Sequence, residues 1–162
     1  MQAVDNLELN RFMGDWHVLA DIATPFDRNA VMPLERYRLN NDNVVETIYQ
    51  YREGTAEGPL RERHIKGFVS KQSNAIWGMQ VFWPIKADYR IIQLDPEYQV
   101  TMIGRNKRDY LWIMARDYPL PQSELNQLMD YARTVGYDTS TLQFTSWQTD
   151  VEAASIYVPS AR

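Results

Sequence analysis

Two histidines, a few isolated carboxylates and an arginine-rich segment are the side chains of this chain that could do chemistry. His17 and His64 fall in different predicted strands, without metal-ligand spacing to a carboxylate. Asp21, Glu46 and Glu62 each stand alone, and the sequence holds neither a G-x-S-x-G motif nor a phosphate-binding glycine loop. With no cysteine, thiolate nucleophiles, disulfides and thiolate metal sites are excluded. The sequence therefore predicts no catalytic residue, no metal site and no cofactor, and it gives an enzyme little support.

The basic residues suggest binding rather than catalysis. In the segment LRERHIKG, Arg61 and Arg63 lie on the same face of a predicted strand, so one or both could point into a cavity and meet an anionic head group. A solvated outer face is the alternative interpretation. A second basic cluster, Arg105, Lys107 and Arg108, falls in a predicted loop. Together these residues weakly favour an anionic amphiphile as ligand.

The bulk composition is that of an ordinary globular protein. The chain has 162 residues, of which 23% are charged and 44% apolar, which suggests one domain spanning residues 1–162. The net charge of −4 makes nucleic acid a poor candidate partner. No stretch approaches the roughly 18 consecutive apolar residues of a membrane-spanning helix.

The elements that would position these residues are mostly strands, because short β-branched and aromatic runs alternate with turn residues at close spacing. Hairpin-length links imply antiparallel neighbours. The barrel is expected over about residues 14–118, and the stretch 24–32 is expected to be a long loop over its mouth. The eight predicted strands are Trp16–Ala23, Glu35–Asn40, Val44–Arg52, Leu60–Val69, Ala75–Trp83, Tyr89–Leu94, Tyr98–Gly104 and Asp109–Arg116.

After the strands the hydrophobic period changes. Leu125, Leu128, Met129, Ala132 and Val135 recur at the spacing of one helix face, which predicts a helix over about 121–135. A short ninth strand is expected over about 141–148. The tail 149–162 shows no clear period. The fold class predicted is all-β: an eight-stranded up-and-down antiparallel barrel with one C-terminal α-helix and a short ninth strand.

Alternation along the strands predicts which side chains face the interior, with His17 and Asp21 outside. Arg61 and Arg63 join the candidate ligand-binding set as the head-group contacts. Trp16 is also expected inside, at the base of the first strand. The other predicted ligand-binding residues are Val18, Ala20, Ile22, Tyr49, Tyr51, Trp77, Met79, Val81 and Trp83.

Three short stretches, in this order and at this spacing, resemble the signature regions of the lipocalins. They are Gly14-Asp15-Trp16, Leu94-Asp95 and Arg116, which ends the run DYLWIMAR. The resemblance covers about residues 7–148 and is closest to the bacterial outer-membrane lipocalins. It implies that the three stretches meet at the closed end of the barrel, where Arg116 lies over Trp16 and plugs the base. The order strands, helix, strand argues against the fatty-acid-binding-protein type of β-cup, which places its helices between the first two strands.

The resemblance implies a one-ended cup that binds, stores or transports a small hydrophobic ligand, with a fatty acid or a lysophospholipid as the expected ligand. A cup filled by its own side chains is the structural alternative. The functional alternatives are a lipocalin-fold enzyme acting on a lipophilic substrate, for which paired inward-facing acids would be the sign, and a carrier of haem, a bilin or a carotenoid.

Localisation rests on the resemblance alone. It implies a periplasmic or outer-membrane-associated protein, held through a lipid anchor on an N-terminal cysteine. The chain carries neither that cysteine nor a basic and apolar leader, so such an anchor is not expected within this sequence. A homodimer stays open as an expectation.

Overall fold

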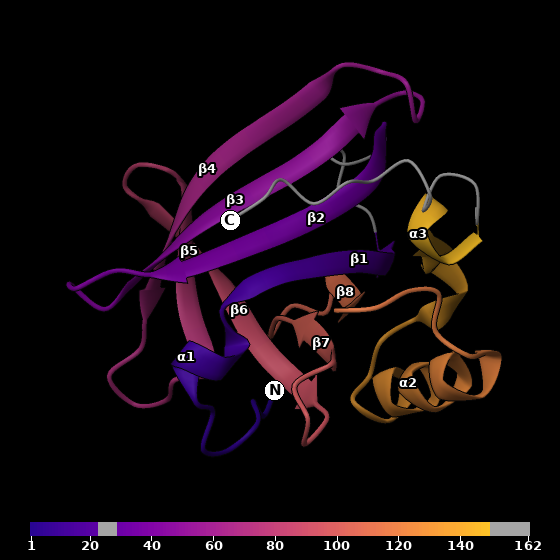
Figure 1. The fold of residues 1–162 in the computed structure, drawn as a ribbon. Coiled ribbons are helices and arrows are strands. Elements are labelled where there is room, and N and C mark those ends of the chain that lie inside the picture. The colour runs from indigo at the N-terminus through magenta and orange to yellow at the C-terminus, as the bar shows by residue number, and fades with distance from the viewer. Residues whose placement is uncertain (23–28, 150–162) are drawn as a thin grey trace.

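The computed structural model describes residues 1–22 and 29–149, and its strands close into a barrel (Figure 1). Each barrel strand pairs antiparallel with its neighbour in sequence, and β8 also pairs with β1, which closes the ring. The eight strands are β1 (Gly14–Ile22), β2 (Ala30–Leu39), β3 (Val44–Glu53), β4 (Leu60–Val69), β5 (Ile76–Phe82), β6 (Ile85–Leu94), β7 (Val100–Gly104) and β8 (Leu111–Ala115). This is the predicted eight-stranded up-and-down barrel.

Helices lie at one end and on one side of the barrel. The short helix α1 (Leu9–Phe12) precedes β1 and lies at the end we call closed, whereas α2 (Gln122–Thr134) lies outside the strands (Figure 1). A 3-10 turn, η1 (Thr139–Thr141), leads to β9 (Gln143–Phe144), which pairs with β1. The predicted C-terminal helix and the ninth strand are therefore both present.

The ninth strand is shorter than expected, because the chain turns into a further helix, α3 (Ser146–Thr149). The indole of Trp147 is buried against the outside of the barrel and donates to the carbonyl of Pro33 at 2.8 Å. The Ser146 hydroxyl accepts from the backbone N–H of Met32 at 2.9 Å. These contacts favour a helical turn over a continued strand.

Most predicted strands match within a few residues, and β4 matches at both ends. The strands β2 and β6 begin earlier than expected, so residues 30–32 belong to β2 and 85–88 belong to β6 rather than to loops. The expected mouth loop falls partly on residues 24–28, and the expected tail on 150–162, which lie outside the described residues.

A bulge in β1 reverses the predicted alternation. Val18 is opposite Met114, but the next paired residue, Ala20, is opposite Ile113. The extra residue, Leu19, offers its carbonyl to the N–H of Thr145 at 2.9 Å. A bulge puts two residues of one strand against one of the other, so the inward side changes beyond it.

The prediction that Ala20 and Ile22 face the interior is therefore wrong. Both pack in the apolar cluster outside the barrel, under α2 and α3. Asp21, predicted to lie outside, is opposite Trp112 instead. Directly opposed residues share a face, and Trp112 belongs to the interior cluster, so Asp21 points inward.

Candidate functional site

The closed end of the barrel is built around the indole of Trp16. Its Nε1 donates to the carbonyl of Phe12 at 2.8 Å, which fastens α1 beneath β1. The guanidinium of Arg116 lies 3.8 Å from the centre of the Trp16 ring. The rings of Trp16 and Phe12 are both fully buried. The stacking implied by the resemblance is thus present, and it forms the floor of the barrel.

Arg116 links the segments of the closed end by donating hydrogen bonds to backbone carbonyls. Nη1 donates to Asp15 at 2.7 Å, and Nη2 donates to the carbonyls of Met13 at 2.8 Å and Arg11 at 3.1 Å. Burial lowers the pKa of Arg116 to about 10, so the group stays charged at neutral pH. Gly14 has φ of +96°, and a Cβ there would lie 3.2 Å from Nη1 of Arg116. Glycine at this position permits both the backbone conformation and the close approach.

Asp95 holds the turn between β6 and β7 at the same end. Its Oδ1 accepts from the N–H groups of Gln99 and Val100, both at 2.6 Å, and its Oδ2 accepts from Glu97 at 3.0 Å. The next residue of this turn, Tyr98, lies under the guanidinium of Arg11 at 4.0 Å. These contacts are structural, and they account for this signature without any chemistry.

Aromatic rings fill the lower half of the barrel. Trp77 stacks on Tyr89 with ring centres 5.2 Å apart, and Tyr37 meets Trp77 edge-on at 5.4 Å. Phe12 packs on Trp16 at 5.0 Å. All five rings are buried. The lower half thus matches the alternative of a self-filled cup, and Trp77 contributes to this filling.

The half of the barrel toward the open end has a different lining. Tyr49 stacks on Trp112 with ring centres 5.5 Å apart, and Met79 belongs to the same interior cluster as both. Tyr51 and Tyr110 are only half-buried there. Partly exposed aromatic side chains beside a buried, adaptable methionine are suited to contact an apolar ligand.

The β3–β4 register turns both Arg61 and Arg63 to the inner face, opposite Tyr51 and Tyr49 respectively. Arg63 is half-buried, and its Nη2 donates to the Tyr51 hydroxyl at 3.3 Å. Arg61 lies nearer the mouth, is exposed, and forms an ion pair with Glu53 at 2.7 Å. Of the two predicted head-group contacts, Arg63 is the one placed within the cup.

The interior also holds polar groups outside the predicted ligand-binding set. Glu35 is 2% exposed and is opposite both Trp16 and Tyr49, and Thr47 is 1% exposed and is opposite Tyr37. The register therefore turns both side chains inward. The sequence signal for Glu35 is its spacing of two from Tyr37 along β2, which puts both side chains on one face of the strand.

Val81 and Trp83 do not form a buried wall. Val81 is 49% exposed and Trp83 is 84% exposed, at the hairpin between β5 and β6 at the open end. The ladder between these strands shifts register between Met79 and Phe82. The predicted alternation is correct up to Met79, and the residues beyond it extend past the barrel wall.

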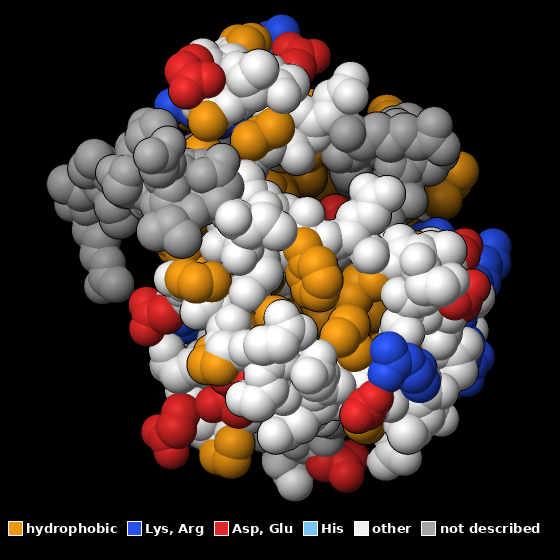
Figure 2. Space-filling model, turned by 90° about the vertical axis from the view of Figure 1, so that its right-hand side faces the viewer, with side chains coloured by type: hydrophobic (Ala, Val, Ile, Leu, Met, Phe, Trp, Pro, Cys, Tyr) orange, Lys and Arg blue, Asp and Glu red, His pale blue; other side chains and the backbone are white. Residues whose placement is uncertain are grey.

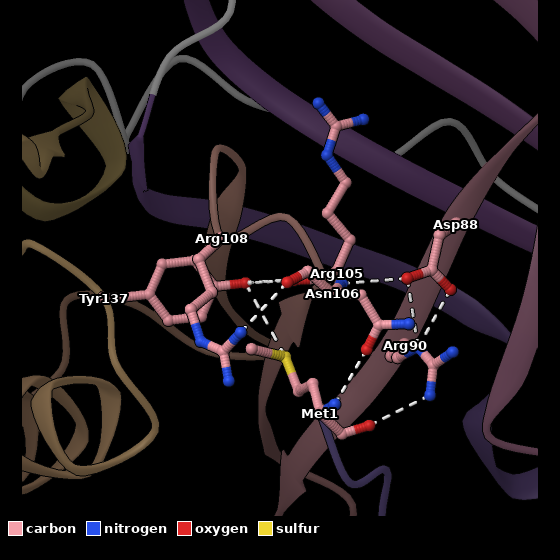
Figure 3. Close-up of polar contacts among 7 residues, drawn as sticks. All are labelled: Met1, Asp88, Arg90, Arg105, Asn106, Arg108 and Tyr137. Atoms are coloured by element: carbon pink, nitrogen blue, oxygen red, sulfur yellow. Dashed lines mark hydrogen bonds and ion pairs between the residues drawn. The ribbon is translucent and has the colours of Figure 1, made fainter.

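The basic loop at the mouth is largely engaged in holding the fold. Arg108 donates from Nε to the carbonyl of Val135 at 2.7 Å and from Nη1 to that of Asn106 at 3.0 Å. Figure 3 shows Arg108 beside Tyr137, and the Arg105 side chain pointing away from both. Arg105 pairs with Asp109, and this pairing lowers the pKa of the Asp109 carboxyl. These contacts weaken the case for this loop as the head-group site.

The N-terminal residue completes the same corner. The amino group of Met1 donates to Asn106 Oδ1 at 2.7 Å, and its carbonyl accepts from Arg90 at 2.9 Å (Figure 3). Arg90 also pairs with Asp88, whose Oδ2 accepts from the Asn106 N–H at 2.9 Å. The chain segment before α1 therefore lies along β6 and braces the β7–β8 loop.

The outer face over α2 and α3 is apolar near its middle and charged toward its edges (Figure 2).

Among residues 1–22 and 29–149, no three His, Asp or Glu side chains gather in a way that could hold a metal ion. In the same residues, no helix is long and apolar enough to cross a membrane.

Comparison with known proteins agrees with this geometry. The family model for a lipocalin-like domain matches residues 7–147. Temperature-induced lipocalin-1 of Arabidopsis thaliana is 30% identical over 166 residues, which cover 98% of this chain and 89% of that protein. The outer membrane lipoprotein Blc of Vibrio cholerae is 24% identical over 151 residues, covering 91% of this chain and 87% of that protein.

Solved structures show the same fold. Lobster apocrustacyanin A1 superposes with a TM-score of 0.66 at 14% identity, covering 84% of this chain and 77% of that one. Insecticyanin from the tobacco hornworm Manduca sexta gives 0.65 at 9% identity, covering 90% and 83%. At such low identity these matches speak for the fold alone.

Proposed function

The chain belongs to the lipocalin family, whose barrels bind small hydrophobic ligands, and we propose that it carries a fatty acid or a lysophospholipid. The observation that supports this most is the lining of the open half of the barrel. Tyr49, Met79 and Trp112 offer apolar surface there, and Arg63 stands among them with its guanidinium 5.5 Å from the Tyr51 ring centre. An acyl chain and an anionic head group match these two kinds of surface.

Desolvation of the acyl chain supplies the affinity. Each buried methylene contributes about 0.8 kcal/mol, so ten give roughly 8 kcal/mol before ordering costs. Those costs remove part of this gain, which leaves micromolar affinity as the expectation. Arg63 orients the head group and adds a modest electrostatic preference that shrinks with salt.

The test is displacement of a fluorescent fatty-acid analogue by oleic acid, in the wild type and two variants. Met79→Trp adds bulk to the apolar lining and should weaken binding at least tenfold. Trp83→Arg changes an exposed ring at the mouth and should leave binding within about twofold. Circular dichroism establishes that both variants are folded. Equal binding by the wild type and Met79→Trp would place the ligand elsewhere.

Two inward carboxylates favour one second candidate, a lipocalin-fold enzyme acting on a lipophilic substrate. Asp21 and Glu35 lie on the neighbouring strands β1 and β2, and both face the interior by register. Glu35 is opposite Trp16, five residues before Asp21 on β1, so the two carboxylates lie at different levels of the barrel. Lipid extract incubated with the wild type and with Asp21→Asn/Glu35→Gln is compared by mass spectrometry. A product formed by the wild type and lost in the double variant supports this candidate, and identical product profiles reject it.

Localisation and assembly are further parts of the proposal. The Blc proteins of Vibrio cholerae and Escherichia coli are outer membrane lipoproteins, and we carry over from them an envelope location for this chain. Fractionation of cells expressing the native gene tests the location. Light scattering on the purified protein tests whether it is a homodimer.

A further inference from the structure

A group of buried hydroxyls lies among the aromatic rings of the lower half of the barrel. Thr47 on β3 is opposite Tyr37 on β2, and the Tyr37 hydroxyl meets that of Tyr89 on β6. Tyr37 and Tyr89 are buried along with Thr47. Three strands thus bring three hydroxyl groups into the interior, in a region otherwise lined by rings.

These hydroxyls have hydrogen-bonding capacity that the described protein groups leave unused. Thr47 Oγ1 is buried and has no hydrogen-bond partner among residues 1–22 and 29–149. Of the two phenol protons of Tyr37 and Tyr89, their mutual bond uses one, which leaves the other to be donated elsewhere. Buried polar groups normally find partners, so an unmet set in a binding cup points to a ligand atom.

The surroundings specify that this ligand atom is uncharged. Burial raises the pKa of Tyr37 and Tyr89 well above the usual value for tyrosine, and the nearby Glu35 carboxyl acts in the same direction. Both phenols are therefore neutral donors near a buried acid. A carboxylate is costly to desolvate in this buried region, whereas a hydroxyl can accept from a phenol and donate to Thr47.

We propose that the hydroxyls of Thr47, Tyr37 and Tyr89 form a polar subsite for a hydroxyl group at the far end of an acyl chain. The inference rests on the proposed function and narrows it to fatty acids oxygenated at or near the terminal carbon. Thr47 and Tyr51 are four residues apart on one strand face, about 13 Å at roughly 3.3 Å per residue. Arg63 is opposite Tyr49, but its guanidinium reaches the Tyr51 hydroxyl, so a medium-length chain spans this distance from the subsite to the guanidinium.

The subsite is covered in this structure. Tyr49 follows Thr47 on the inward face of β3, stacks on Trp112 and is nearly fully buried. A chain that enters from the mouth therefore reaches Thr47 only when the Tyr49 ring shifts. Side-chain rearrangement of this size is common on ligand binding.

The test compares 12-hydroxydodecanoic acid with dodecanoic acid, by titration calorimetry on the wild type and on variants. In a purely apolar cup, the terminal hydroxyl weakens binding on the order of tenfold or more. Here the hydroxy acid should bind at least as tightly as the plain acid. Thr47→Val and Tyr89→Phe should each weaken the hydroxy acid about three- to tenfold and leave dodecanoic acid within about twofold.

Two further variants separate this role from a general loss of packing. Thr47→Ser keeps a hydroxyl and should keep the preference. Tyr131→Phe removes a phenol hydroxyl outside the barrel, where it donates to the Ile92 carbonyl at 2.9 Å, and should bind both acids like the wild type. Tighter binding of dodecanoic acid than of the hydroxy acid by the wild type overturns the subsite but leaves the proposed function standing. Failure of both acids to bind overturns both.

Discussion

The guanidinium of Arg116 lies 3.8 Å from the centre of the Trp16 ring, and it donates to the backbone carbonyl of Asp15 at 2.7 Å. One cation thus covers the aromatic floor and ties β1 to β8 at the closed end. A cation over an indole contributes about 0.5–2 kcal/mol, more as the pair is desolvated. Because these contacts are distant from the mouth, we assign the pair to stability and not to ligand choice.

Loss of the Trp16 ring should therefore be costly to the fold. Trp16→Ala removes a fully buried ring and should lower the free energy of unfolding by about 3–5 kcal/mol. The matched control is Trp83→Ala, whose ring is exposed and should change stability by about 0.5 kcal/mol or less. Urea melts give both values. Similar losses in the two variants would mean that Trp16 is not part of a packed floor.

The several hydrogen bonds of the Arg116 guanidinium should contribute more to stability than its positive charge. Arg116→Lys keeps a cation but cannot reach the separate carbonyls of Asp15, Met13 and Arg11 at once. Part-buried carbonyls left unpaired should destabilise the fold by roughly 1–3 kcal/mol. Arg38→Lys, at an exposed position, serves as the control. A thermal midpoint unchanged in Arg116→Lys would show that the hydrogen bonds are dispensable.

The closed end could be predicted from sequence because its geometry demands particular residue types. Gly14 adopts φ of +96° against Arg116, and Asp95 accepts three backbone N–H groups in one turn. Few other residues meet these requirements, so short motifs carry the information. The barrel class followed similarly from turn residues and alternating strands.

The inner face beyond Val18 could not be predicted in this way. The β1 bulge depends on Thr145, whose hydroxyl donates to the Val18 carbonyl at 2.7 Å across 127 positions of the chain. The alternation of side chains within one strand contains no information about that long-range contact. Alternation also separates two faces without showing where the wall stops, which is why Trp83 was expected inside.

Exposure of Trp83 predicts its response to a polar quencher. The chain has five tryptophans, and Trp83 is 84% exposed whereas Trp16, Trp77 and Trp147 are fully buried. Iodide should quench part of the wild-type emission, and Trp83→Phe should lose most of that quenchable part. Trp147→Phe is the control and should retain it. Equal quenching of the wild type and Trp83→Phe would show that the hairpin folds back against the protein.

His17 should make stability depend on pH. Its ring packs against those of Tyr118 and Trp147, with centres 4.5 and 4.7 Å away, and burial lowers its pKa below the usual 6.5. The Ala115 and Arg116 backbone contacts, together with the negative charges of Asp15 and Asp117, oppose this shift without reversing it.

Because the folded state prefers the neutral imidazole, the unfolded state binds the extra proton first as pH falls. The contribution of His17 is thus fully present above pH 6.5 and is lost as the pH falls through 6.5 toward the lower folded pKa. His17→Phe keeps a ring against Tyr118 and Trp147 and cannot be protonated. In urea melts at pH 7.5 and 5.5, the wild type should lose more stability than His17→Phe, since carboxylate effects are common to both. An equal loss would mean that His17 titrates freely and that α3 does not bury it in solution.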